Sequence, residues 1–381
     1  MGMMETSYTV RFVTPAFLGD ADQRGRWRTP PFKALMRQWW RVAAAKECDY
    51  KWEQLRKREG ELFGHAWLEK WAMRSQVRVL LNNWKNGCMN NWPKSAKVKH
   101  PEVNFSVDAN LYLGYGPLIY DKAIKGTMLK NKAPCIGVNE TATLNLQYPQ
   151  EQAETFRKTI DLMQLFATIG ARSRNGWGSF VLEDNQIKSP YEMLSSPAYA
   201  DCLRNFGACL SLDWPHAIGM DRAGPLVWRS DPFGSWQEAQ QRLASIKIAL
   251  RTNCSISKNT DAKNPILDER HFLAYPVTNH GVKGWCDEKN GKPILDKRGK
   301  LKQTERLASQ IRFKVLQDHE RKYRGVIYHM PCGLPKVLTD LLKSKEDKDF
   351  VKERQLGVWQ KVHRVLDSYE GKGLTRVKGG V

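Results

Sequence analysis

Alternation of apolar and polar positions predicts two strands in the first half of the chain. Tyr8, Val10 and Phe12 alternate with Thr9 and Arg11, the period of a strand that buries one face. The same alternation returns over residues 141–148, and a third strand is expected from residue 178 onward.

A helical period governs the segments between these strands. Pro30 and Pro31 suit the first turn of a helix, and the apolar residues at 32, 35, 36, 39 and 43 then share one face. Residues 151–168 form a second amphipathic pattern. Residues 50–100 are charged and rich in tryptophan, and we expect an insertion there, helical over 51–85 and then irregular.

The order strand, helix, strands, helix, strand is the β-α-β-β-α-β plan of a ferredoxin-like, RRM-like α+β unit. Turn residues and prolines near 185–200 indicate a boundary, so we predict one domain over 1–190 and a second over 191–381. In the second domain the patterns predict strands over 206–212, 272–277, 310–316 and 323–329, helices over 236–250 and 335–369, and a basic loop over 282–304.

Charge narrows the possible partners. The chain of 381 residues has 61 Lys plus Arg against 40 Asp plus Glu, a net charge of +21, together with 14 Trp. A basic surface attracts polyanions, of which nucleic acid is the commonest, and interleaved arginines and aromatics hold single strands. A soluble basic protein without such a partner is the alternative.

The eight cysteines contain no C-x-x-C pair, which argues against a zinc ribbon and a disulfide framework. We expect reduced thiols in a cytoplasmic protein. No apolar run is long enough to span a membrane. We expect no metal and no cofactor, because Asp20 and Asp22 fit a helix cap or arginine partners better than a metal site.

The segment from Gly170 to Ser179 is the strongest candidate for function. Gly170, Gly176 and Gly178 allow positive φ and close approach to a ligand, while Arg172 and Arg174 offer forked donors that match phosphate geometry. Ser173, Asn175 and Trp177 complete the loop, and no acid lies between Asp161 and Glu183. Trp177 either stacks on a base or packs beneath the loop, and we favour packing.

A second basic feature is Lys33, Arg37 and Arg41, spaced by four residues on the first helix. Like charges at this spacing repel each other, and the helix dipole disfavours a cation in the first turn. An anion along the row would explain it. The alternative is neutralisation by Asp20, Asp22 and solvent.

The motifs at 14–22, 28–41 and 170–179 resemble the RAMP superfamily of CRISPR proteins, and within it most of all the first subunit of type III-B (Cmr) effector complexes. Ala34 stands where that family usually has glycine, and Trp177 where it usually has phenylalanine. The segments 272–276 and 306–331 resemble the family more faintly.

The resemblance implies tandem ferredoxin-like domains, binding of CRISPR RNA or target RNA near the 3′ end of the guide, and docking onto other RAMP subunits. It implies RNA contacts at Lys33, Arg37, Arg41, Gly170, Arg172, Ser173, Arg174, Gly176 and Gly178. In that family the subunit binds RNA and does not cleave it. The tryptophans of 52–92 form either a partner contact or an accessory core.

Two alternatives stay open. Endoribonucleases of the same superfamily process precursor CRISPR RNA, and His65, His100, His280 and His329 are available as bases. None has an obvious acid–base partner in the sequence, so we predict a non-catalytic protein. The other alternative is a single-strand RNA chaperone outside CRISPR systems.

Overall fold

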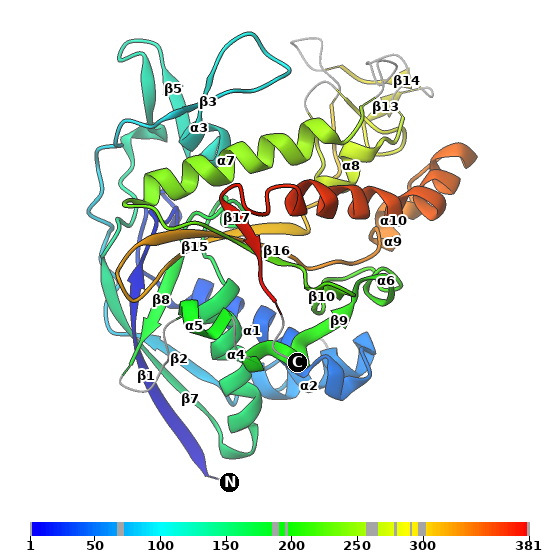
Figure 1. The fold of residues 1–381 in the computed structure, drawn as a ribbon. Helices are drawn as coiled ribbons and strands as arrows, with labels where there is room; N and C mark the ends of the chain where they lie inside the picture. The colour runs from blue at the N-terminus through cyan, green and yellow to red at the C-terminus, as the bar shows by residue number, and fades with distance from the viewer. Residues whose placement is uncertain are drawn as a thin grey trace.

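The computed structural model has an α+β fold with several antiparallel sheets (Figure 1). It describes residues 2–66, 72–184, 190–194, 197–256, 266–277, 280–289, 292–295 and 302–378. Part of the predicted basic loop 282–304 therefore lies outside the described residues. No helix in the described ranges is both long and apolar enough to cross a membrane.

The first sheet is four-stranded and antiparallel, in the order β2-β7-β1-β8. In chain order its unit runs β1 (Met3–Phe12), α1 (Thr29–Ala44), β2 (Arg78–Leu81), β7 (Thr141–Pro149), α4 (Ala153–Phe166) and β8 (Phe180–Glu183). Tyr8 lies opposite Leu144, and Phe12 lies opposite Phe180. The predicted strands near 8–12, 141–148 and 178–182 and both predicted helices are confirmed.

The expected insertion at 50–100 is wrong in its extent. Helix α2 (Trp52–Phe63) ends at Gly64, and β2 is a strand of the first sheet that falls inside the helix predicted over 51–85. The larger excursion comes after β2. It holds β3 (Lys97–Val98), β4 (Val107–Asp108), α3 (Ala109–Gly114), β5 (Leu118–Asp121) and β6 (Gly126–Leu129).

The second sheet has the order β15-β16-β12-β17 and is also antiparallel. Its elements follow the same sequence as in the first: β12 (Val227–Ser230), α7 (Trp236–Asn253), β15 (Ile311–Gln317), β16 (Tyr323–His329), α10 (Lys345–Asp367) and β17 (Leu374–Arg376). The predicted hairpin of β15 and β16 and the helix α7 are confirmed.

Smaller elements connect and flank this sheet. They are α5 (Pro190–Leu194), β9 (Leu203–Asn205), α6 (Phe206–Cys209), β10 (Ile218–Asp221), β11 (Gly224–Pro225), α8 (Glu269–Leu273), β13 (Glu288–Lys289), β14 (Lys292–Pro293) and α9 (Lys336–Asp340). Short 3₁₀ turns cover Lys46–Cys48, Lys130–Lys132, Gln150–Gln152 and Pro197–Cys202. The strands predicted over 206–212 and 272–277 are wrong, because helices α6 and α8 occupy the start of each segment.

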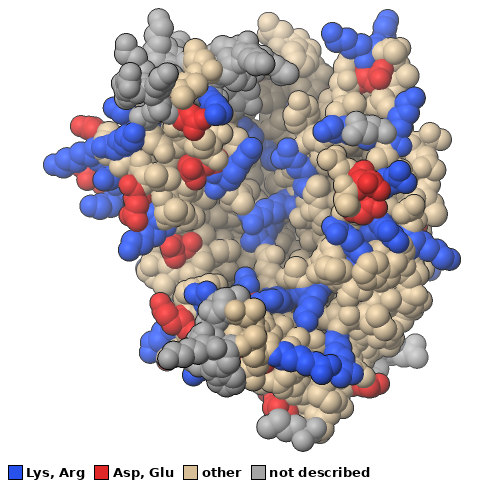
Figure 2. All heavy atoms as spheres, turned by 180° about the vertical axis from the view of Figure 1, so that it is seen from behind, with Lys and Arg blue, Asp and Glu red and all other residues tan. Residues whose placement is uncertain are grey.

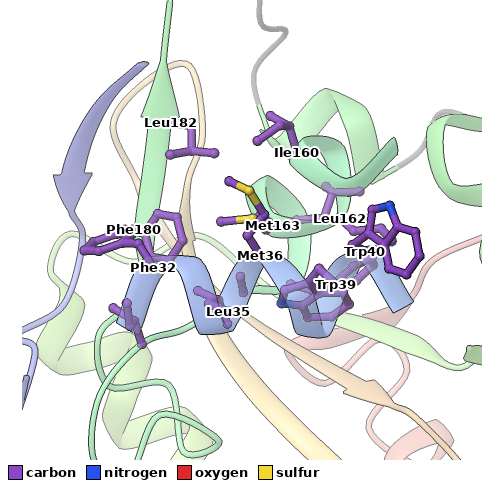
Figure 3. Packing of buried hydrophobic residues seen from close by; sticks show 14 of the residues in the cluster. Phe32, Leu35, Met36, Trp39, Trp40, Ile160, Leu162, Met163, Phe180 and Leu182 are labelled. Carbon is purple, nitrogen blue, oxygen red and sulfur yellow. The ribbon is translucent and has the colours of Figure 1, made fainter. Parts of the chain in front are cut away.

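The elements stack in four layers: first sheet, α1 with α4, second sheet, and α7 with α10 (Figure 1). Figure 3 shows the side of α1 that carries Phe32, Met36 and Trp39 turned toward α4 and β8. The ring of Phe166 on α4 then lies 4.9 Å from that of Tyr328 on β16. The second sheet is therefore buried on both faces, which explains why every residue of β15 is buried.

Candidate nucleic-acid interface

The glycines of the loop between α4 and β8 are required by the protein itself. Gly178 has a φ of +65°, and a Cβ there would lie 1.9 Å from the carbonyl oxygen of Ile169. A Cβ on Gly170, whose φ is +97°, would lie 2.7 Å from the carbonyl oxygen of Phe17. Gly176 faces Gln240 of α7, and Gly176 and Gly178 are both buried. The prediction that these glycines allow a ligand to approach is corrected. Neighbouring segments of the chain occupy the space that a Cβ atom would need.

The loop backbone joins the two sheets. Its Arg174 carbonyl accepts a hydrogen bond from the amide of Phe313 on β15 (3.0 Å), and the Ser179 hydroxyl accepts one from the amide of Val315 (2.9 Å). The Ser179 and Thr14 hydroxyls both donate to the carbonyl of Gly176. Residues 176–179 of the loop are therefore buried between β8 and β15. A ligand cannot reach this side of the loop.

Trp177 is fully buried and packs against other aromatic rings. Its ring centroid lies 5.3 Å from that of Phe17, 5.4 Å from that of Trp92 and 5.9 Å from that of Trp236. Packing, the favoured alternative, is confirmed, and Trp177 does not offer a face to a base.

Of the two loop arginines, Arg172 is exposed and Arg174 is half-buried. Arg172 is exposed and adopts a left-handed backbone with φ of +57°, and its Nε donates to the carbonyl of Tyr115 (2.6 Å). Arg174 donates to the carbonyl of Ser309 (3.0 Å), and burial lowers the pKa of its guanidinium to about 10. A non-glycine residue held at positive φ is uncommon, and such strain gathers at functional sites.

The cationic row on α1 has partners within the protein. Arg37 and Arg41 both hydrogen-bond the carboxylate of Glu59 on α2, at 2.7 Å and 2.5 Å, and this carboxylate is 3% exposed. Lys33 donates to the Ser75 hydroxyl (2.8 Å). Arg37 and Arg41 share one carboxylate of α2, and in the described residues neither Asp20 nor Asp22 pairs with them. RNA contacts at the three cations of this row stay a prediction.

A cleft of about 640 Å³ opens beside Arg172 and Arg174. The loop and Tyr115 form one side, α7 contributes residues 247–251, and the segments 270–276 and 306–313 close the other side. The back of the molecule is hollowed, with Lys and Arg along its walls (Figure 2). The cations that line the cleft are Arg172, Arg174, Lys247, Arg251, Arg270 and Arg306.

No carboxylate is among the described residues that line this cleft. Among the described residues, only Arg270 of the six cations has an ion-pair partner, which is Glu102. That pairing lowers the pKa of the Glu102 carboxyl. Burial lowers the pKa of Lys247 to about 7, with Arg251 and then Arg172 adding to the shift. The cleft therefore carries an excess of positive charge that attracts an anion.

Four of these cations were missed by sequence reasoning, although one signal was present. Lys247 and Arg251 repeat at i and i+4 on a helix, the same spacing of like charges that drew attention to α1. Arg270 and Arg306 flank or begin segments that resemble the RAMP superfamily faintly, and the fold places both beside the loop.

The other predicted groups lie away from this cleft. The carboxylate of Asp20 accepts bonds from the amides of Asp22 and Arg24, which makes it part of a turn. No cluster of metal-ligating residues occurs among the described residues. His329 is fully buried against His363, and burial holds its pKa well below the usual range. It is placed to pack, not to act on RNA.

The described tryptophans of 52–92 differ in burial, and a partner contact of the exposed ones stays a prediction. Trp92 packs on Trp177 in the interior, whereas Trp52 and Trp84 are 37% and 48% exposed. Trp67 and Trp71 lie outside the described residues. All eight cysteines are free, and seven of them are buried.

Comparison with known proteins gives a family match for the N-terminal half. Residues 9–181 match the model of the RAMP superfamily. No curated protein sequence matches the chain.

Solved structures align with this chain over almost its whole length. Cmr1 from Pyrococcus furiosus (apo form) is 16% identical, with 100% of both chains covered and a TM-score of 0.46. Chains in two cryo-EM structures of type III-B Cmr-beta bound to cognate target RNA are 12% and 13% identical. Each covers 95% of this chain and 99% or 100% of its own, with TM-scores of 0.45 and 0.47. At these scores no residue is equated between the structures.

Proposed function

We propose that the chain, whose residues 9–181 match the model of the RAMP superfamily, is a single-strand RNA-binding subunit of a type III-B CRISPR effector complex. The RNA is CRISPR RNA, target RNA or both. The two sheets with the same strand order then represent tandem ferredoxin-like domains, over 1–190 and 191–381. The protein acts in the cytoplasm, beside other RAMP subunits, as a binding component without catalysis.

One observation supports RNA binding above the others: six cations line one cleft that has no carboxylate among its described lining residues. Arginine forks and a lysine match phosphate oxygens. Contacts of this kind position a strand and do not read its sequence. The cleft is enclosed between two walls, which suits a single strand better than a duplex.

One exposed aromatic residue of the cleft supports the same proposal. Tyr115 is 67% exposed and lines the cleft, whereas Tyr275, which also lines it, is buried. Bases stack on an exposed ring such as that of Tyr115 without regard to sequence. Of the site residues that the sequence predicts, Arg172, Ser173, Arg174 and Asn175 line the cleft. We propose them as RNA-binding residues together with Lys247, Arg251, Arg270 and Arg306.

Salt dependence of RNA binding tests this proposal. The affinity of a labelled single-stranded RNA is measured by fluorescence anisotropy at several salt concentrations. Each phosphate contact contributes about 0.7 to the slope of log K against log salt for a single strand. Arg172→Ala and Arg251→Ala should each flatten the slope by roughly this amount.

Arg78 on the edge strand β2 supplies the matched control, because it is exposed and has no ion pair within the described part of the chain. Arg78→Ala removes the same charge and should leave the slope unchanged. If the two cleft variants behave like Arg78→Ala, RNA does not bind in the cleft. A duplex competitor should displace the strand less effectively than a single-stranded one.

Cleavage of precursor CRISPR RNA is a second candidate, and Lys247 is the observation that favours it. Metal-independent cleavage needs a base near a 2′-hydroxyl, and a lysine with a pKa of about 7 is partly neutral at physiological pH. Histidine is absent from the described lining residues. Cleavage of repeat RNA at one site in EDTA, lost in Lys247→Met, would establish the nuclease.

A third candidate is an RNA chaperone outside CRISPR systems. The neighbourhood of the gene separates it from the proposal, because a subunit of an effector complex is expected beside other CRISPR genes.

A further inference from the structure

Lys247 occupies the floor of the cleft, between α7 and the loop. Its Nζ donates to the Oδ1 atom of Asn175 at 2.7 Å and lies 5.8 Å from the ring centroid of Tyr112 on α3. The Nδ2 group of Asn175 donates to the carbonyl of Leu113 at 2.7 Å. That second bond fixes the amide, so that its oxygen points at the lysine. An ammonium has three donors, and in the described residues Asn175 is the one acceptor of Lys247.

The charges that face Lys247 are almost all positive. Arg251 lies one turn further along α7 than Lys247, and Arg172 faces Lys247 from the loop. Arg174 and Arg270 line the same cleft. The Glu102 carboxylate lies close enough to raise the pKa of Tyr112, but it accepts hydrogen bonds from Arg270. Tyr112, facing from α3, has a pKa raised by burial and carries no charge at neutral pH.

A partly buried lysine surrounded by arginines is unfavourable for the free protein. Desolvation and like charges both disfavour its charged form, and no carboxylate of the described lining compensates. A phosphodiester in the cleft reverses this situation, because a nearby negative charge favours the ammonium. The position of Lys247 is therefore better suited to the bound state than to the free state.

We propose that Lys247, oriented by Asn175, is a phosphate anchor at the floor of the cleft, and that its amine takes up one proton from solvent when single-stranded RNA binds. The inference rests on the proposed function and adds a regulation of the same site. In the free protein the amine is mostly neutral above pH 7. In the complex the protonated amine donates to a phosphate oxygen while Asn175 keeps its bond.

This coupling makes RNA affinity depend on pH. Binding that takes up a proton weakens as pH rises, with a limit of one proton per site. Between pH 6.5 and 8.5 the affinity of the unmodified protein should fall about twentyfold, because the free lysine loses its proton in this range. The arginines of the cleft stay charged throughout and contribute no pH dependence.

The experiment uses oligoadenylate, whose bases and phosphodiesters do not titrate between pH 6.5 and 8.5, at one fixed salt concentration. Lys247→Met should bind more weakly at pH 6.5 and show no fall at pH 8.5. Lys247→Arg keeps a permanent charge, and its affinity should be equal at the two pH values. Lys57 on α2 is exposed and is not among the residues that line the cleft, so Lys57→Met should retain the full fall in affinity.

A second variant keeps the test valid if Lys247→Met fails to fold. Asn175→Asp places a carboxylate beside the amine, which should keep the lysine charged in the free protein and abolish the pH dependence. Calorimetry in two buffers of different ionisation enthalpy should give uptake of nearly one proton for the unmodified protein at pH 8, and none for Lys247→Arg.

Three results would overturn the inference: affinity of the unmodified protein that does not change with pH, a pH dependence that persists in Lys247→Arg, or shortening of the oligonucleotide in EDTA. The last would show that the lysine acts as a base. None of these decides RNA binding itself, because the salt slopes of Arg172→Ala and Arg251→Ala test it separately.

Discussion

Replacing Gly178 by alanine tests whether the glycines of the loop serve the fold or a ligand. At Gly178 an added Cβ meets the carbonyl oxygen of Ile169 at 1.9 Å, and the backbone has a φ of +65°. Alanine in the left-handed region costs about 1–2 kcal/mol. Relief of the contact must also separate two backbone segments that share hydrogen bonds.

The magnitude follows from those bonds. The amide of Ile169 donates to the carbonyl of Gly178 (3.0 Å), and the amide of Gly178 donates to the carbonyl of Pro15 (2.9 Å). A buried backbone group left without its partner costs about 1–3 kcal/mol. With the backbone term, Gly178→Ala should lower the free energy of unfolding by about 4 kcal/mol or more, a large part of the 5–15 kcal/mol typical of a domain.

Gly371 is the matched control. Its φ is +70°, and nothing lies within 4 Å of an added Cβ, so Gly371→Ala carries only the backbone cost of about 1–2 kcal/mol. Urea unfolding followed by tryptophan fluorescence compares the two variants, and anisotropy measures their RNA affinity. A Gly178→Ala protein that is as stable as Gly371→Ala but does not bind RNA would refute this reasoning, because the glycine would then be needed by the ligand.

Three further predictions concern charged and titratable groups in the interior. Glu59→Gln should lower the free energy of unfolding by about 2–3 kcal/mol, which is less than for a fully buried pair because the two arginine partners reach water. RNA affinity should stay unchanged, and a fall in affinity would show that α1 belongs to the binding site. Lys314→Met should lower the free energy of unfolding, measured by urea titration, by about 2 kcal/mol, since the lysine donates to two carbonyls at the end of α4. A more stable variant would show that burial of the amine destabilises the protein more than its hydrogen bonds stabilise it. Burial lowers the pKa of His363 to about 3, so the stability it contributes is present above pH 6.5 and decreases as pH falls, by about 2 kcal/mol between pH 7 and pH 5; an unfolding midpoint equal at both pH values, or equally pH-dependent in His363→Gln, would contradict this.

The sequence predicts the longer elements well and the short ones poorly. The alternation at 8–12 and the apolar face of α1 extend over enough residues to show their period, and both elements form where expected. β2 and β12 have four residues each, too few for a period to appear. β2 follows α2 in the sequence, and the helix predicted over 51–85 therefore includes both elements.

The site could be predicted only in its local part. Arg172 and Arg174 are recognisable because the loop motif is continuous in sequence. Lys247, Arg251 and Arg270 join them only because β15 lies against the loop and brings α7 and α8 to the same cleft. The role of Gly178 was misjudged because positive φ alone does not tell whether a ligand or the chain approaches the glycine.

Crosslinking tests the central claim most directly, namely that a single RNA strand lies in the cleft. The purified protein is irradiated with single-stranded RNA containing 4-thiouridine, and the crosslinked peptides are identified by mass spectrometry. The account predicts adducts in the segments around Tyr115, 172–175 and 270–276, reduced by Arg172→Ala. Adducts confined to α1, α2 and β2, with none from the cleft, would contradict it.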